Sequence, residues 1–254
     1  MYEPWSGADH LVKQDPTYLK GFTMSENTAM VERIRKLFAK AESTTSTHER
    51  DALLSKAYDL LAKHGIEEAL ARGADDSEAE TVTVWEFRPK GSYKLDQIIL
   101  ISSVADALHC KTVRFGQDVA YVYGVKRHLD RISMLGGFLV AYMIGNLATL
   151  KAPYGVHATT YRKSAMSAFA SVVATRLREA EHRAKEESSD SAGAEIVLVS
   201  DARKAEAEMR RAHPRVQTSQ RRVSSAGYGE GSAHGNRVDL GGSRLSNRRR
   251  AISA

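Results

Sequence analysis

The sequence predicts an α+β protein with an N-terminal helical hairpin, a small mixed or antiparallel sheet packed with long helices, and a flexible basic C-terminal tail. Apolar residues recur at helical spacing in residues 25–66, and short alternating, β-branched runs follow from residue 81. After Gln217 the apolar content collapses into glycine, serine and arginine. The predicted segments are an irregular arm (1–24), the hairpin domain (25–72), the α+β core domain (80–213) and the tail (214–254).

Residues 25–66 predict two helices joined by a polar turn. Ser46 followed by Glu49 forms a capping box at the start of the second helix, and Gly65 stands where that helix should stop. Leu37, Phe38, Leu54 and Leu61 are expected to lie between the two helices or against the core. The apolar positions on one side of each helix are Val31, Ile34, Leu37, Phe38 and Ala41, then Leu53, Leu54, Ala57, Tyr58 and Leu61.

The hairpin motifs resemble a known family. The first helix ends in Lys36, Leu37, Ala41, Glu42, Ser43 and Thr44, and the second carries Ala57, Leu60 or Leu61, Lys63, His64, Gly65 and Ile66. These motifs resemble the bacterial and phage family called domain of unknown function 2786. Residues 80–254 resemble its companion, domain of unknown function 7168, through Tyr161-Arg162-Lys163-Ser164, Phe169 and Arg176-Leu177. The resemblance implies an architecture and a phage or mobile-element setting, and it carries no established activity.

The core domain begins after an acidic linker at residues 73–80. The alternating run 81–87 predicts a strand, and Ser92 to Leu108 predicts a helix. Two strands follow at Lys111–Phe115 and Val119–Val125, and a short turn at Gly116-Gln117-Asp118 joins them. This order predicts a largely antiparallel sheet.

The run from Ile132 to Leu150 contains no charged residue and is long enough to span a membrane. Its glycines, Asn146 and Thr149 dilute its hydrophobicity, so we expect a buried core helix and no membrane association. A long amphipathic helix should follow from Tyr161 to about Glu187. A short strand is expected at Glu195–Val199, and Asp201 is expected to cap a last helix that ends before Pro214.

The sequence offers no recognisable catalytic or metal-binding motif, so whether the protein is an enzyme stays open. The nine histidines are scattered, and the single cysteine, Cys110, is expected to be a buried structural thiol. We therefore predict neither a metal site nor a cofactor. The glycine-rich stretch 227–231 follows arginine-rich coil rather than a strand, which argues against a nucleotide loop. The lone cysteine and the absence of a signal-peptide pattern favour a cytoplasmic protein.

Arginine is the strongest functional signal. Residues 201–254 contain 12 Lys and Arg against 5 Asp and Glu. Because guanidinium groups bind phosphate bidentately, a mobile run of them suits a DNA or RNA backbone, although a solvated tail without a partner explains the same charge. The candidate nucleic-acid-binding residues are Arg221, Arg222, Arg237, Arg244, Arg248, Arg249 and Arg250.

The first hairpin helix offers a weaker basic surface. Arg33, Arg35, Lys36 and Lys40 lie on its polar side, where Glu32 and Glu42 interrupt them. Because of these interruptions, a solvated amphipathic face explains this pattern better than an interface does.

The leading hypothesis is therefore sequence-nonspecific association with nucleic acid. One alternative is a protein–protein adaptor that uses the hairpin, and an exposed apolar hairpin face would favour it. The other is a hydrolase with a dispersed active site, and a tight cluster of polar residues in a core pocket would favour that.

Overall fold

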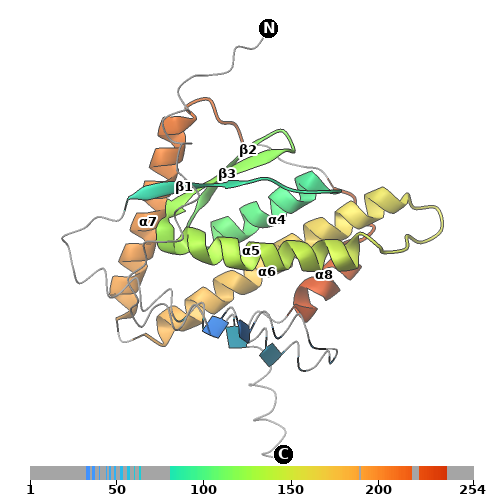
Figure 1. Cartoon of the computed structure of the whole chain (residues 1–254), viewed down its shortest axis with the longest axis horizontal. Coiled ribbons are helices and arrows are strands. Elements are labelled where there is room, and N and C mark those ends of the chain that lie inside the picture. Colours follow the sequence, from blue (N-terminus) through green and yellow to red (C-terminus); the bar gives the residue numbers. More distant parts are fainter. Residues whose placement is uncertain are drawn as a thin grey trace, which may run out of the picture.

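The computed structural model describes residues 81–188, 190–218 and 223–238, together with single positions between residues 33 and 63. Figure 1 shows the strands on one side of α4, α5 and α6, with α7 crossing one end of the molecule and α8 lying toward the other. The predicted arm at 1–24 lies outside the described residues. The elements are β1 (Val82–Phe87), α4 (Lys94–Ala107), β2 (Lys111–Phe115), β3 (Val119–Val125), α5 (Lys126–Leu147), α6 (Ala158–Glu186), α7 (Ser191–Ala212) and α8 (Tyr228–Arg237).

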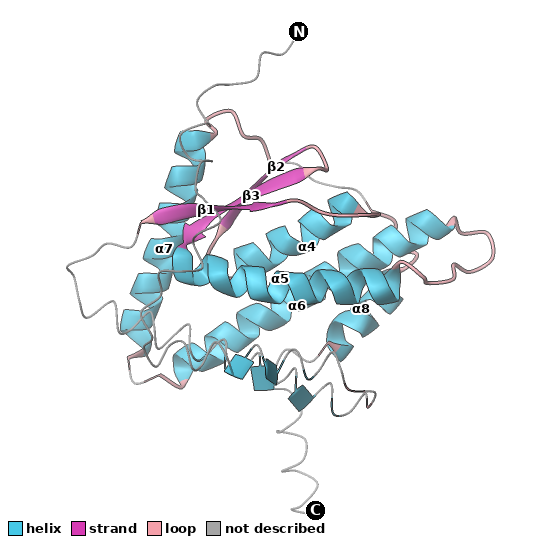
Figure 2. Cartoon of the chain, viewed as in Figure 1, coloured by secondary structure: helices cyan, strands magenta, loops and turns pink. Residues whose placement is uncertain are grey.

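The three predicted strands form one antiparallel sheet in the order β1-β3-β2, which confirms the α+β class (Figure 2). The register runs from Val82↔Val125 to Phe87↔Ala120 between β1 and β3, and Phe115 pairs with Val119 between β2 and β3. Gly116 begins the β2–β3 turn with a φ of +61°, a conformation that glycine adopts without a steric penalty.

Both faces of the sheet are covered because the side chains alternate along each strand. Trp85 and Val122 face the main core, which α4, α5 and α6 build. Val113 and Tyr123 face the opposite way and pack with Met209 of α7. The sheet therefore lies between the helical layer and the C-terminal half of α7.

The uncharged run from Ile132 to Leu150 forms most of the core helix α5, which ends at Leu147, three residues before the run does. Leu139 and Met143 of this helix are completely buried. The helix begins earlier than the run, at Lys126, and its first turns carry charged residues. No described helix combines the length and the apolar character that crossing a membrane requires.

Helix α6 confirms the predicted amphipathic helix, with Met166, Phe169 and Val173 buried. The prediction for the next segment was wrong. Residues 195–199 belong to the continuous helix α7, whose N-cap is Asp190 and not Asp201. The β-branched run suggested a strand, but Leu198 and Met209 lie on the buried side of a helix, and Asp201 is buried between them.

The expected tail contains a helix that the composition did not predict. Helix α8 packs along α6, and Gly227, Gly231 and Gly235 lie at the contact. A Cβ atom at Gly231 would come closer than 3.0 Å to the backbone of Ala165, so the two helices approach more closely than side chains would allow. Arg176 donates to the carbonyl oxygens of Gly235 and Asn236 (2.8 and 3.2 Å) and to that of Val238.

The described hairpin positions fit the predicted hairpin. Ile34 and Ala57 are buried in the main core. The Glu49 N–H donates to the Ser46 hydroxyl (3.3 Å), as the capping box predicts. Leu37, Leu53 and Leu60 pack against the core, whereas Phe38, Leu54 and Leu61 lie outside the described residues.

Candidate functional site

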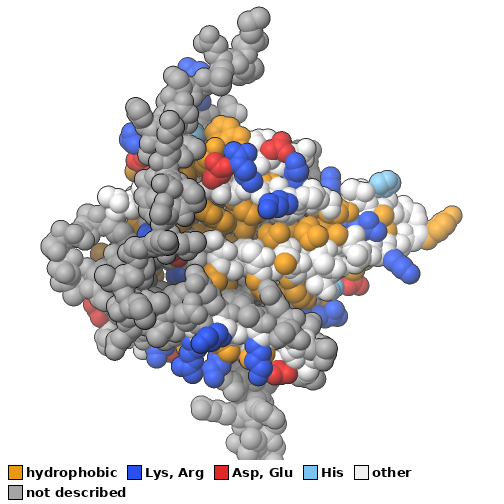
Figure 3. Space-filling view, viewed as in Figure 1, with side chains coloured by type: hydrophobic (Ala, Val, Ile, Leu, Met, Phe, Trp, Pro, Cys, Tyr) orange, Lys and Arg blue, Asp and Glu red, His pale blue; other side chains and the backbone are white. Residues whose placement is uncertain are grey.

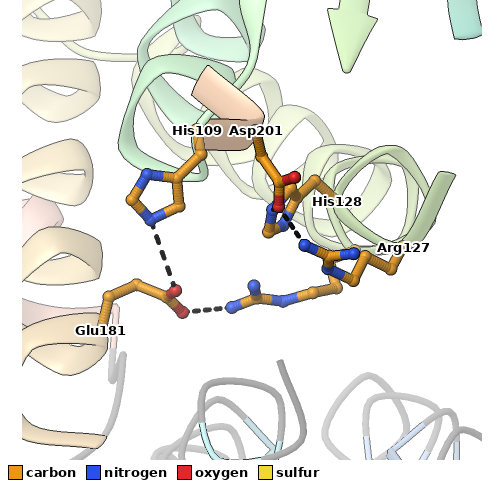
Figure 4. Close-up of polar contacts among 6 residues, drawn as sticks. His109, Arg127, His128, Glu181 and Asp201 are labelled. Atoms are coloured by element: carbon orange, nitrogen blue, oxygen red, sulfur yellow. Dashed lines mark hydrogen bonds and ion pairs between the residues drawn. The ribbon is translucent and has the colours of Figure 1, made fainter. Parts of the chain in front are cut away.

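Charged side chains meet in the interior where the first turns of α5 face α6, α7 and the turn after α4 (Figure 4). In the view, His109 and Glu181 face Arg127, His128 and Asp201, and a second guanidinium reaches Glu181. Five of the six residues are exposed by 7% or less, and the side chain of His109 is 26% exposed. We call this group the charge cluster: His109, Arg127, His128, Arg131, Glu181 and Asp201.

Asp201 joins α7 to α5. Its carboxylate forms a buried ion pair with Arg127, and its Oδ2 lies 3.2 Å from Nε2 of His128. Because an ionised carboxylate only accepts hydrogen bonds, this contact places the imidazole proton on Nε2 of His128. Nδ1 of His128 is buried and accepts no hydrogen bond from the described residues.

Glu181 joins α6 to the same helix. It pairs with Arg131, one helical turn after Arg127, and its Oε2 lies 3.9 Å from Nε2 of His109. That separation is too long for a hydrogen bond. Oε2 of Glu181 and two nitrogens of Arg131, Nε and Nη1, are buried without hydrogen-bond partners in the described part of the chain. Unsatisfied atoms of this kind cost stability, so the cluster is not fully compensated.

His109 occupies an unusual backbone position. It directly follows the C-cap residue of α4, Leu108, and has a φ of +62°. The next residue, Cys110, donates its N–H to the Ala105 carbonyl (2.9 Å), which closes the helix end as a Schellman motif does. Glycine is the favoured residue at this position, and a side chain there is strained by about 1 kcal/mol.

Burial controls the protonation of the cluster. It lowers the pKa of His128 well below the usual histidine value, and the charges of Arg131 and Arg127 lower it further. Burial also lowers the pKa of His109, which Glu181 opposes, and raises that of Asp201, which Arg127 opposes. Both histidines are therefore neutral near pH 7.

Cys110 fits the predicted structural thiol. It is buried, and burial raises its pKa to about 12. A Cβ atom at Gly124 would collide with its sulfur, so strand β3 passes directly against the thiol. A thiol of this kind is a poor nucleophile at neutral pH.

The charge cluster is tight and mostly buried, and only the side chain of His109 is partly exposed. The cluster atoms without hydrogen bonds among the described residues, including Nε2 of His109, are buried. The hydrolase alternative called for a tight polar cluster in a core pocket, and it stays a prediction; the described side chains form ion pairs that join α5 to α6 and α7. Within the same part of the chain, no group of three or more His, Cys, Asp or Glu residues could hold a metal ion.

Of the arginines proposed from the sequence, Arg237 lies among the described residues. Arg237 lies at the end of α8 and is exposed. The next residue, Val238, is buried in the main core. Arg221, Arg222, Arg244, Arg248, Arg249 and Arg250 lie outside the described residues.

A second basic surface lies on the hairpin. The described leucines of the hairpin, together with Ile34 and Ala57, face the core, and Figure 3 shows Lys and Arg side chains gathered near the hairpin segments. Glu49, the acidic residue among the described hairpin positions, is paired with Lys40 at 3.2 Å. Glu32 and Glu42 lie outside the described residues. We call the exposed basic residues the hairpin stripe: Arg33, Lys36, Lys40, Lys56 and Lys63.

Comparison with known proteins identifies one segment. Residues 29–68 match the model of the family described as Protein of unknown function (DUF2786). This match confirms the resemblance of the hairpin, whereas the resemblance of residues 80–254 to domain of unknown function 7168 stays a prediction. No curated protein and no solved structure matches the chain significantly.

Sequence reasoning missed the charge cluster, although a signal was present. Glu181 follows Leu177 by one turn on the buried side of α6, and Asp201 lies between Leu198 and Ala205 on that of α7. A charged residue that continues an apolar period must be paired when it is buried. The signal shows that partners exist, but it does not show which residues they are.

Proposed function

We propose that the protein is a cytoplasmic protein that associates with DNA or RNA backbones without sequence preference. The observation that carries the proposal is the hairpin stripe on the outer side of a hairpin whose inner side is packed. Ile34 and Ala57 are buried, which fixes the orientation of both helices. The stripe is exposed and therefore accessible to a polyanion.

The spacing of the stripe suits phosphate contacts. Arg33 and Lys40 are seven residues apart on the first helix, and Lys56 and Lys63 are seven apart on the second. Two helical turns advance about 10 Å, so each helix presents charges along its length. Duplex DNA offers a phosphate about every 1.7 Å of axis, and cations that neutralise phosphates gain affinity by releasing counterions.

The arginine-rich tail supports the same proposal. Residues 215–254 contain eight Arg against two acidic residues. Helix α8 packs along α6, and Val238 directly after it is buried in the main core. In the sequence, Arg244 and Arg248–Arg250 come shortly after this docked segment. Tail and hairpin would then contribute phosphate contacts from one protein, and affinity would depend on both.

The adaptor alternative finds less support. It requires an exposed apolar hairpin face, and every large apolar residue among the described hairpin positions is buried or packed against the core, while the small Ala52 is exposed. An adaptor that binds its partner through the basic side would itself bind polyanions. The binding experiment described next would detect that.

The experiment measures binding of the full chain to a labelled duplex and a labelled single strand over a range of salt. Lys36→Gln/Lys56→Gln/Lys63→Gln should weaken binding equally for all sequences. It should also reduce the slope of log K against log salt by about 0.9 for each duplex phosphate that the variant leaves without a cation. Deletion of residues 239–254 should flatten the slope independently.

A matched variant removes the same charge elsewhere. Lys90→Gln/Lys151→Gln/Arg203→Gln also removes three exposed cations, and it should leave the slope close to wild type. Equal reductions in affinity for the two triple variants would assign the effect to net charge and remove the hairpin from the proposal. Absence of binding at about 50 mM salt would refute the proposed function.

A further inference from the structure

Helix α7 is attached to the rest of the molecule at three places. Near its start, Ala194 and Leu198 pack with Ala184 of α6. Near its end, Met209 packs against the sheet, and His213 contacts the Tyr123 hydroxyl at 2.7 Å. In the middle, Asp201 pairs with the first turn of α5. The outer side of α7 carries the exposed apolar residues Ile196 and Val199.

We infer that the middle contact is a proton-sensitive latch, formed by Arg127, His128 and Asp201, which holds α7 on α5 at neutral pH and releases it in acid. The latch is a regulatory device that neither the sequence motifs nor the family match assigns. It is independent of nucleic-acid association.

The geometry requires His128 to be neutral. Its side chain is completely buried. Arg127 and Arg131 approach it from its own helix, and Asp201 approaches it from α7. The ring centroid of His109, on the turn after α4, lies 5.6 Å from the ring centroid of His128. Arg131 is in turn paired with Glu181 of α6.

The charges of these groups already cancel. Each carboxylate of the charge cluster is paired with an arginine, and both histidines are neutral. A proton on His128 would therefore add a net positive charge to a buried group beside two guanidiniums. A buried charge without its own counter-ion is strongly unfavourable, so the proton is accepted only when His128 becomes exposed.

The direction of the pH effect follows from linkage. The pKa of His128 is lowered in the closed molecule because of burial, while an exposed histidine titrates near its ordinary value of 6.5. Above pH 6.5 neither state binds the proton, and the latch keeps its full strength. Below pH 6.5 the open state binds a proton on His128 that the closed state refuses, and this group by itself raises the open population about tenfold per pH unit. The raised pKa of Asp201 acts in the opposite direction once that carboxylate begins to titrate.

Hydrogen exchange of the full chain between pH 7.5 and pH 5.0 tests the latch, with rates corrected for intrinsic exchange. Opening of residues 194–209 should increase about tenfold per pH unit below 6.5, while residues 98–105 of α4 keep their protection. In His128→Gln the amide can still donate to Asp201 and cannot be protonated in this range. The pH dependence of opening should therefore disappear.

The matched control is His213→Gln. His213 lies at the end of α7 and contacts Tyr123 of the sheet, and burial lowers its pKa as well. Because His213 is only partly buried whereas His128 is completely buried, this variant should keep most of the pH dependence of wild type. Loss of the dependence in His213→Gln, or exchange of α7 that does not respond to pH in wild type, would overturn the inference.

A measurement on the wild-type protein covers the case in which His128→Gln does not fold. Imidazole nitrogen resonances report the protonation state and tautomer of each histidine. His128 should be neutral with its proton on Nε2 at pH 6.0 while α7 is protected. A charged His128 in the protected state would refute the latch.

Discussion

The two ends of helix α6 make different kinds of contact. Toward its start, the backbone around Ala165 meets the glycines of α8. Toward its end, Glu181 enters the charge cluster. The first contact relies on the absence of side chains, and the second relies on full charges removed from water. Adding one methyl group disrupts close backbone packing, whereas removing one partner disrupts a buried ion pair.

Breaking the ion pair should have the largest effect. Arg131→Met should lower the free energy of unfolding by about 3–5 kcal/mol, because Glu181 remains buried without its cation. The double variant Arg131→Met/Glu181→Leu should recover most of that stability, since an apolar pair of similar volume often replaces a buried ion pair without cost. Urea unfolding measures both. A double variant as unstable as the single one would show that the ion pair stabilises the fold by more than each ion neutralising the other.

A methyl group at the glycine contact should have an intermediate effect. Gly231→Ala should weaken the docking of α8 by about 1–3 kcal/mol, because the new Cβ meets backbone that cannot move aside. Hydrogen exchange of residues 228–237 measures the docking. Gly229→Ala is the matched control: its Cβ would meet nothing within 4 Å, and alanine favours a helix by about 1 kcal/mol. Similar results for both variants would mean that the glycines matter only through helix propensity.

The strained histidine should show the smallest effect. His109→Gly and His109→Ala remove the same ring, but only glycine relieves the positive φ. The glycine variant should therefore be more stable than the alanine variant by about 1 kcal/mol in thermal or urea unfolding. Equal stabilities would show that the turn after α4 relaxes to a different conformation when the ring is removed.

The sequence predicted the elements better than the site. The bounds of β2 and β3 follow from β-branched runs around a glycine turn, and Ser46 and Glu49 mark a helix start that the structure confirms. The strand at 195–199 was wrong because local β-propensity is weak where a longer helical period competes with it. The spacing of Gly227, Gly231 and Gly235 was visible, but its use in helix contact was not.

What the sequence determined by itself is local: periodicity, caps, turns and the position of the arginines. These features depend on residues within one or two helical turns of each other, so one segment contains the whole signal. The tertiary structure alone decided that His109, Arg131 and Glu181 meet, and that Asp201 reaches the first turn of α5. Those contacts join residues that are 50 to 74 positions apart and lie on different elements. Only the packing of α5, α6 and α7 specifies them.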